Sequence, residues 1–292
     1  MIEKAILSTL LFLLKTLPIA VVTIYLISYL IRKGYMERIT LSIQPLLRRF
    51  GVSEIAVLSV ATCFVSPTAS YSILSQAWRE GKVDERGVVA ISFLNSFPSV
   101  FSHLYSYFIP FVIPVLGFAG IVYTLTRFAV AIVKSLFGLL LLRKWSGNII
   151  EKDVKITTAS PSENILRISV IMATSYFVVS LASELGIFNT LADTLSFLPV
   201  NSNSLAIAVV EFFNIRAAVV VAASLIDSGM HWKWAVVGLI LGNVISFSAR
   251  AVKHSLPMHV SFFGKFGIKI VALNSLATFI LDIFFIVILL MV

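Results

Sequence analysis

Long apolar segments separated by short polar ones dominate the chain. They cover residues 5–31, 87–101, 111–126, 164–183 and 270–292. A helix needs about 20 residues to cross the ~30 Å hydrocarbon core of a membrane, and several of these segments approach or exceed that length. The pattern therefore predicts an all-α polytopic membrane protein.

The composition agrees with this interpretation. Of the 292 residues, 59% are apolar and only 13% are charged, and the mean hydropathy is +0.99. Ordinary globular domains carry roughly 25% charged residues. The net charge of +9 is better explained by basic segments at one membrane face than by nucleic-acid binding.

The sequence shows no pattern typical of an enzyme or a cofactor site. Cys63 is the single cysteine, which permits no intramolecular disulfide, and no metal-binding motif is recognisable. We therefore expect no catalytic residues, no metal and no cofactor. The expected location is a membrane that the chain crosses several times, and a family resemblance described below implies the cell (plasma) membrane of a prokaryote. The expected partners are the lipid bilayer and a small-molecule solute, without nucleic acid, and homo-oligomer formation stays open.

The second half of the chain repeats the first. An offset of 148 residues pairs Asn95 with Asn243, and an offset of 147 pairs Gly117 with Gly264. Several further glycine and proline positions follow the same offsets, and repeats of this kind indicate a duplicated structural unit. The predicted units are a first repeat at 1–142, a polar cytoplasmic linker at 143–163 and a second repeat at 164–292.

Charge predicts that the two repeats have inverted topology. Residues 32–49 include five Lys or Arg, whereas the equivalent residues 184–201 include none. Cytoplasmic loops collect Lys and Arg, so equivalent segments should face opposite sides of the membrane. Inversion requires that each half crosses the membrane an odd number of times.

The stretch FVSPTAS at 64–70 predicts a helix break inside an apolar segment. Proline removes a backbone donor and disfavours helix for the residue before it. Basic residues both precede and follow residues 52–78, so the chain should enter and leave on the same face. This is a re-entrant helical hairpin with its tip at Ser66, Pro67 and Thr68.

Each repeat should then follow one plan. A first span (10–31 or 164–183) leads to an interfacial helix (36–49 or 188–199) and a hairpin (52–79 or 202–228). Two crossings complete the unit, at 87–109 and 111–142 or at 234–256 and 258–290. The first crossing of each pair is a broken transmembrane helix, interrupted by FLNSFPS (93–99) or GNVIS (242–246). Inverted repeats with broken helices are typical of secondary transporters.

We expect substrate-binding residues at the hairpin tips and the broken crossings. The candidates are Ser66, Thr68, Asn95, Ser96, Ser99, Glu211, Asn214, Arg216, Asn243 and Ser246. The two equivalent asparagines either bind the solute through their amides or bond neighbouring helices. Arg216 either faces a cavity and attracts an anionic solute, pairs with Glu211, or replaces a bound Na⁺.

Other ionisable residues lie within the predicted crossings. His103 follows the first break and is a candidate proton relay, although an interfacial hydrogen-bonding role is the alternative. Lys134 is expected to extend its ammonium group to the cytoplasmic face. Asp282 could pair with Arg127 or Lys134 from the other repeat, and the sequence does not choose between them.

The stretches FVSPTASYSILSQAWREGKVDERG and NSFPSVFSHLYSYFIPFVIPVLGFAGIVY resemble the nucleoside recognition (Gate) family of prokaryotic membrane proteins. Relatives in that family include YjiH-type proteins, the sporulation membrane proteins SpmA and SpmB, and the membrane part of the ferrous-iron transporter FeoB. The plan of elements is similar, more distantly, to concentrative nucleoside transporters. The resemblance implies one Gate unit in each half and nucleosides as the substrate class. The isolated Cys63 departs from the Cys-containing motifs of FeoB.

These observations predict a secondary transporter that works by alternating access. The expected solute is small and polar, first of all a nucleoside or a related compound, whether neutral or anionic. A non-transporting membrane scaffold or partner protein is one alternative, and a channel for ions or small anions is another.

Overall fold

In a computed structural model, the described residues are 2–34, 38, 42, 45, 52–142, 170, 173, 177, 181, 185, 201–245 and 255–291. Their regular structure consists of the helices α1 (Ile2–Arg32), α3 (Glu54–Cys63), α4 (Pro67–Arg79), α5 (Glu85–Leu94), α6 (Ser96–His103), η1 (Leu104–Val112), α7 (Ile113–Leu116), α8 (Phe118–Leu142), α11 (Ser202–Phe213), α12 (Ile215–Asp227), α13 (Trp232–Ile245), α15 (Leu256–Phe263) and α16 (Lys265–Met291). Apart from single positions, the predicted segments 36–49, 143–163, 164–183 and 188–199 lie outside the described residues.

Three helical segments of the described chain are long and apolar enough to cross a membrane. They are Glu85–Leu116, Phe118–Leu142 and Lys265–Met291. At 1.5 Å per residue, the 27 residues of α16 extend over about 40 Å. Helix α1 is 31 residues long and exposes large apolar side chains such as Leu14 and Val22. These features confirm the predicted all-α membrane protein.

Helices α3 and α4 form an antiparallel pair, joined at the break that the sequence predicts. Helix α4 begins at Pro67, in the first turn, where a missing N–H removes no helical hydrogen bond. Ser66 caps this helix, because its hydroxyl oxygen accepts a hydrogen bond of 3.2 Å from the Ala69 N–H. Between the two helices, the hydroxyl oxygens of Ser59 and Ser70 are 2.9 Å apart.

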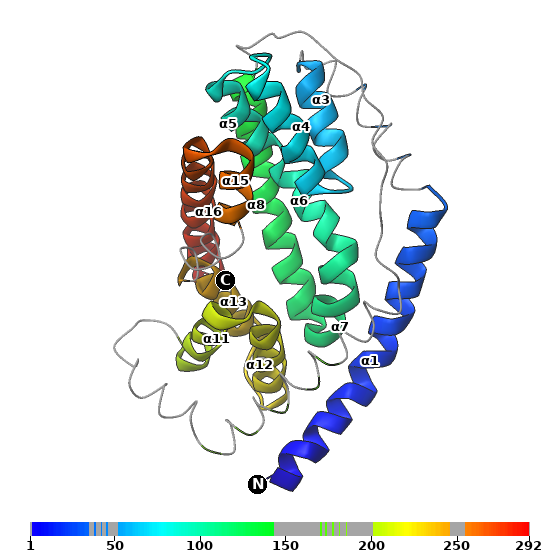
Figure 1. The fold of residues 1–292 in the computed structure, drawn as a ribbon. Helices are drawn as coiled ribbons and strands as arrows, with labels where there is room; N and C mark the ends of the chain where they lie inside the picture. Colours follow the sequence, from blue (N-terminus) through cyan, green and yellow to red (C-terminus); the bar gives the residue numbers. More distant parts are fainter. Residues whose placement is uncertain are drawn as a thin grey trace.

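Helices α11 and α12 form the equivalent pair in the second half, and Asn214 separates them. Its backbone is extended (φ −156°, ψ 111°), like that of Ser66 (φ −146°, ψ 104°). The Asn214 Oδ1 atom accepts hydrogen bonds from the N–H groups of Arg216 and Ala217, at 2.9 and 3.3 Å. The first pair lies at the upper end of the molecule in Figure 1 and the second pair lies at the lower end.

The broken crossing of the first half is interrupted where the sequence predicts. Helix α5 ends at Leu94, Asn95 occupies the break, and α6 begins at Ser96. In the second half, α13 ends at Ile245, within the GNVIS stretch. Residues 246–254 follow and lie outside the described chain.

The predicted boundary between the last two crossings of each half is wrong. We expected it at Pro110 and Pro257, but the chain turns at Gly117 and Gly264, which have φ values of +57° and +58°. Glycine adopts positive φ without a steric penalty, so it ends a helix in this conformation. Pro110 is instead accommodated inside the π-helical segment η1, and Pro257 lies in the first turn of α15.

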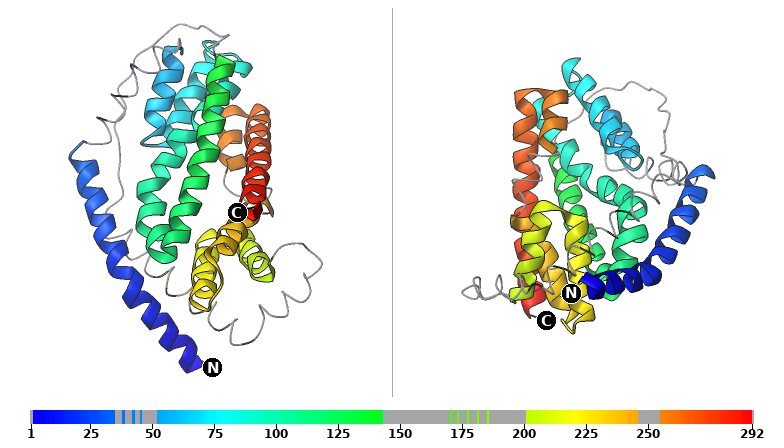
Figure 2. Two further views of the ribbon diagram at one scale, coloured as in Figure 1. Left: turned by 180° about the vertical axis from the view of Figure 1, so that it is seen from behind. Right: turned by 60° about the horizontal axis from the view of Figure 1, so that its bottom comes forward.

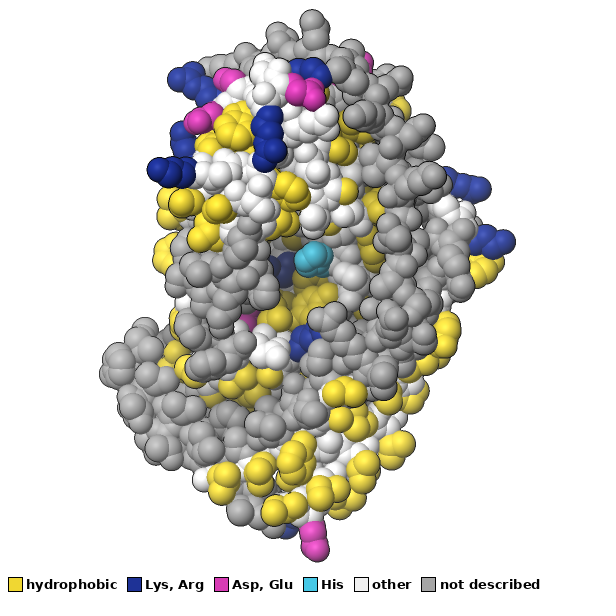
Figure 3. All heavy atoms as spheres, viewed as in Figure 1, with side chains coloured by type: hydrophobic (Ala, Val, Ile, Leu, Met, Phe, Trp, Pro, Cys, Tyr) yellow, Lys and Arg dark blue, Asp and Glu magenta, His cyan; other side chains and the backbone are white. Residues whose placement is uncertain are grey.

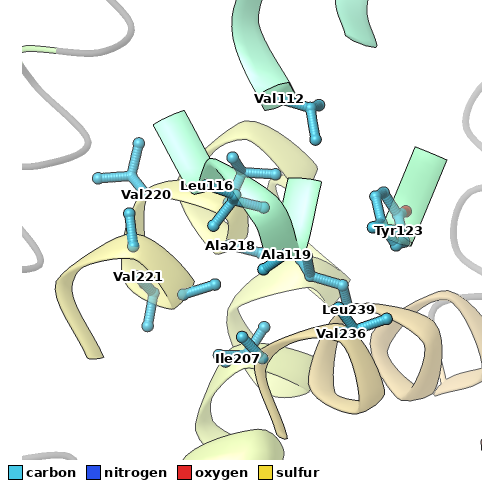
Figure 4. Close-up of a cluster of buried hydrophobic side chains, with 14 of the residues drawn as sticks. Val112, Leu116, Ala119, Tyr123, Ile207, Ala218, Val220, Val221, Val236 and Leu239 are labelled. Atoms are coloured by element: carbon cyan, nitrogen blue, oxygen red, sulfur yellow. The ribbon is translucent and has the colours of Figure 1, made fainter. Parts of the chain in front are cut away.

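Elements of the first half pack against elements of the second half. Helix α4 contacts α15, α12 contacts α7, and α8 lies beside α16 (Figure 2). One apolar cluster joins Leu116 and Tyr123 of the first half to Ile207 and Val236 of the second (Figure 4). A second cluster joins α3 and α4 to aromatic residues of α15 and α16, including Phe263.

Candidate functional site

A cavity of about 280 Å³ with many polar lining residues lies beside Asn95, at the break between α5 and α6. Its walls come from α4, α5, α6 and α8 of the first half and from α15 and α16 of the second. The polar lining residues include Asn95, Ser96, Ser99, Lys134, Asn274 and Thr278. Pockets for drug-sized ligands have volumes of roughly 300–1,000 Å³, so this cavity suits a small solute.

The surface around the middle of the molecule differs from its upper end. In Figure 3, acidic and basic side chains are mixed at the upper end, and basic side chains, a histidine and a small acidic patch are visible where the face is hollowed at mid-height. The cavity itself is lined by two basic residues, Arg127 and Lys134, and by the buried His259. Basic groups at membrane depth are unusual and typically mark functional sites.

Asn95 links the helix break to the first hairpin. The side chain is 1% exposed, and its Nδ2 atom donates hydrogen bonds to the hydroxyl oxygens of Ser59 and Ser70, at 2.9 and 3.0 Å. The Cys63 thiol also lies 3.5 Å from the Asn95 carbonyl oxygen. The side-chain oxygen Oδ1 is buried without a hydrogen-bond partner in the described part of the chain. This amide thus fixes the local structure and keeps one acceptor available.

The hairpin tip of the first half reaches the second half beside the cavity. The Thr68 hydroxyl is 3.8 Å from the Met258 sulfur on α15. Ser66 is occupied as the cap of α4. Pro67 and Tyr71 of this pair line the cavity, whereas Ser66 and Thr68 do not. Of the predicted residues of the first half, the structure therefore brings Asn95, Ser96 and Ser99 together in the cavity wall.

Those predicted residues of the second half that the structure describes do not line this cavity. Asn214 is exposed and caps α12. Glu211 is 3% exposed and packs against Gly242, where an added Cβ would lie 2.5 Å from the carboxylate oxygen Oε2. Arg216 is half-buried, and Ser246 lies outside the described residues. The substrate-binding roles of these residues stay predictions.

A buried ion pair joins the two long helices α8 and α16. An Arg127 guanidinium nitrogen lies 2.6 Å from Asp282 Oδ1, and Asp282 is 1% exposed. The Asn243 amide donates a hydrogen bond to the other oxygen of Asp282. The pairing that the sequence left open is therefore with Arg127. Asn243 thus makes a contact between helices, and its solute-binding role stays a prediction.

The sequence interpretation expected Lys134 to extend its ammonium group to the cytoplasmic face. In the structure, this group contacts α16 in the cavity wall instead. Its ammonium nitrogen donates hydrogen bonds to the Thr278 hydroxyl at 3.0 Å and to the Asn274 carbonyl oxygen at 3.1 Å. The Asn274 amide in turn donates to the Ser92 hydroxyl at 2.8 Å. These contacts hold Lys134 against α16 in the cavity wall.

Sequence reasoning missed the contribution of α16 to the cavity. Asn274, Thr278 and Asp282 recur every four residues, which places their side chains along one face of a helix. This polar face in an otherwise apolar segment was the available signal. His259 was missed as well. Its Nδ1 atom is 2.8 Å from the Ser255 carbonyl oxygen, and its ring centroid lies 4.5 Å from that of Tyr71.

Comparison with known proteins yields one family and several archaeal relatives. The family model described as nucleoside recognition (Gate) matches residues 13–121. The uncharacterized protein MJ0871 of Methanocaldococcus jannaschii is 38% identical over 285 residues, which covers 92% of this chain and 90% of that protein. The uncharacterized protein MJ0880 of the same organism is 22% identical, over 90% of this chain and 92% of its own length. The uncharacterized protein MJ1556, also of that organism, is 21% identical, over 95% of this chain and 94% of its own length. No solved structure matches.

Proposed function

Because the chain belongs to the nucleoside recognition (Gate) family of membrane proteins, we propose that it is a secondary transporter of a small polar solute. The leading solute class is a nucleoside or a related compound, moved across the cell membrane by alternating access. The observation that supports this most is the cavity at Asn95, which is lined by polar residues on membrane-length helices of both halves. Transporters commonly bind their solute at broken helices near the bilayer midplane.

The proposal includes two inverted repeats. Equivalent positions have the same backbone conformation at Ser66 and Asn214, and at Gly117 and Gly264. Equivalent contacts occur between α4 and α15 and between α12 and α7. Helices α8 and α16 run antiparallel, since Arg127 pairs with Asp282 while the later residue Lys134 contacts the earlier residue Thr278. These features support two units of opposite orientation with re-entrant hairpins at opposite faces.

Alternating access then follows from motion between the repeats. The cavity is bounded by the first hairpin and broken crossing on one side and by α15 and α16 on the other. A rigid-body movement of one repeat relative to the other would open this cavity to one face at a time. Polar contacts such as Thr68 to Met258 lie between the two moving parts.

Uptake into proteoliposomes tests this function. Purified protein should accumulate at least one labelled solute from a panel of neutral and anionic nucleosides and related compounds. Ser99→Leu should abolish uptake, because a larger side chain fills the cavity wall without removing a side-chain hydrogen bond of Asn95. Ser261→Leu is the matched control, because Ser261 is exposed on α15 and does not line the cavity. Solute-dependent ionic currents of single channels would instead indicate a channel. Complete lack of uptake, with a fixed partner co-purifying, would indicate a scaffold.

A further inference from the structure

Lys134 is a cation in the cavity wall without an acidic partner among the described residues. Its two hydrogen-bond acceptors there, the Thr278 hydroxyl and the Asn274 carbonyl oxygen, are both neutral. An ammonium group has three donors, so one donor remains after these two contacts. A charged amine at this depth is unfavourable unless a counter-charge or water compensates it.

The nearby acidic residue of α16 is already occupied. Asp282 lies one helical turn beyond Thr278, but its Oδ1 atom pairs with Arg127 and its Oδ2 atom accepts from Asn243. Arg127 is thus paired, and among the described residues that line the cavity Lys134 is the basic side chain with a free donor and no ion-pair partner. A cavity whose described lining includes an unpaired ammonium group and no acidic side chain favours an occupant that brings a negative charge.

The rest of the cavity wall fits such an occupant. Ser96 and Ser99 of the broken crossing and Ser275 of α16 have hydroxyl groups that can donate to a carboxylate. The buried Oδ1 of Asn95, which has no partner in the described chain, is an acceptor for an N–H or O–H group. The wall therefore offers an anion site and a separate acceptor site within about 280 Å³.

From this arrangement we infer that the cavity binds a small, singly charged organic anion, with Lys134 contacting its carboxylate and Asn95 accepting a hydrogen bond from a hydroxyl, amino or amide group of the same molecule. The inference rests on the proposed transport function and specifies its substrate class. It also assigns the anion-binding role to Lys134 rather than to Arg216 at the second hairpin tip. Neutral nucleosides lack the group that Lys134 would contact.

Matched pairs of compounds test the charge requirement. Lactate and lactamide differ only by replacement of a carboxylate with a neutral amide, and orotidine is uridine with an added carboxylate. Thermal unfolding of the purified full-length protein should show that the anionic member of at least one pair raises the melting temperature. At a ligand concentration of about 100 times Kd, the expected rise is at least about 3 °C. The neutral members should have little effect.

Variants of the lysine separate its charge from its packing. Lys134→Met keeps the length of the side chain and should weaken anion binding about 10–100-fold, because a charge-assisted hydrogen bond is lost. Lys134→Arg should retain most of the binding. Lys269→Met is the matched control, since Lys269 is exposed on the same pair of helices and its ion pair with Glu85 lies outside the cavity lining.

The outcomes distinguish this inference from the proposed function. Equal stabilisation by both members of a pair, retained in Lys134→Met, would overturn the anion assignment while the transport proposal stands. A lack of response of the wild-type protein to every anion tested would overturn it as well. Anion binding that depends on Lys134 but is never accompanied by uptake into proteoliposomes would uphold the site and refute transport.

Discussion

Replacing Asp282 with asparagine should destabilise the protein strongly, because it removes the ion-pair partner of a buried guanidinium. The Arg127 and Asp282 side chains are 15% and 1% exposed, and their charged atoms are 2.6 Å apart. Removing one partner of a buried ion pair costs about 3–5 kcal/mol. Because each kcal/mol lowers the melting temperature of a protein of this size by about 2–4 °C, the expected decrease is about 6–20 °C.

A second substitution tests whether the unpaired charge causes this loss. Arg127→Met in the Asp282→Asn background removes the guanidinium charge, and the asparagine still offers a side-chain oxygen to Asn243. The double variant should therefore recover at least half of the lost melting temperature. Glu85→Gln is a control, because Glu85 pairs with Lys269 at 3.5 Å where both side chains are more than half exposed. Surface ion pairs contribute about 0–1 kcal/mol.

The assay is thermal unfolding of the purified protein in detergent, followed by the fluorescence of its four tryptophans. The reasoning is refuted if Asp282→Asn loses no more stability than Glu85→Gln, since the buried pair would then contribute no more than an exposed one. It is also refuted if the double variant is as unstable as Asp282→Asn alone. In that case the loss would come from packing and not from an uncompensated charge.

Three further predictions address the topology and the packing. Single cysteines can be placed at the two ends of the first hairpin (Glu54 and Glu80) and of the second (Asn203 and Ser228). In sealed vesicles, both ends of the first hairpin should be labelled from one face and both ends of the second from the opposite face. Labelling of the two ends of one hairpin from different faces would exclude re-entry. Gly138→Ala should destabilise the protein by about 1–3 kcal/mol in thermal unfolding. The reason is that the added Cβ would lie 2.5 Å from the Leu94 backbone nitrogen and 2.7 Å from the Ala90 carbonyl oxygen. An unchanged melting temperature would contradict this contact. Asn214→Ala should cost about 0.5–2 kcal/mol through loss of the α12 cap, whereas Asn214→Asp should retain the cap and most of the stability.

The helix breaks could be predicted because their causes are local. Pro67 cannot continue the preceding helix, and Ser66 and Asn214 have short polar side chains that cap the next one. Each effect involves residues within a few positions of the break. The sequence interpretation placed two boundaries at Pro110 and Pro257 instead of at Gly117 and Gly264. A proline inside a π-helical segment, as at 110, or in the first turn of a helix, as at 257, does not end a crossing.

The contacts between the repeats could be predicted only in part. The sequence suggested a partner for Asp282 on the other repeat, but the choice between Arg127 and Lys134 depends on the register of α8 against α16. These two basic residues are seven positions apart, so they lie on the same helical face and either could meet an acidic residue. The register depends on contacts between residues far apart in the chain, such as that of the Lys134 ammonium with the Thr278 hydroxyl, 144 positions away.

In the proposed duplication, the position equivalent to Lys134 carries no cation, so the proposed anion site has no equivalent on the other copy of this helix. At an offset of 147 residues, Arg127 corresponds to Asn274 and Ser135 to Asp282, so both copies keep polar side chains at these positions. Lys134 corresponds to Leu281, which cannot bind an anion. A second ammonium group at the equivalent place would double the desolvation cost and repel the first across the α8–α16 contact. The asymmetry therefore limits that cost to one charge, and it places this charge at the helix break where Asn95 offers its unpartnered oxygen.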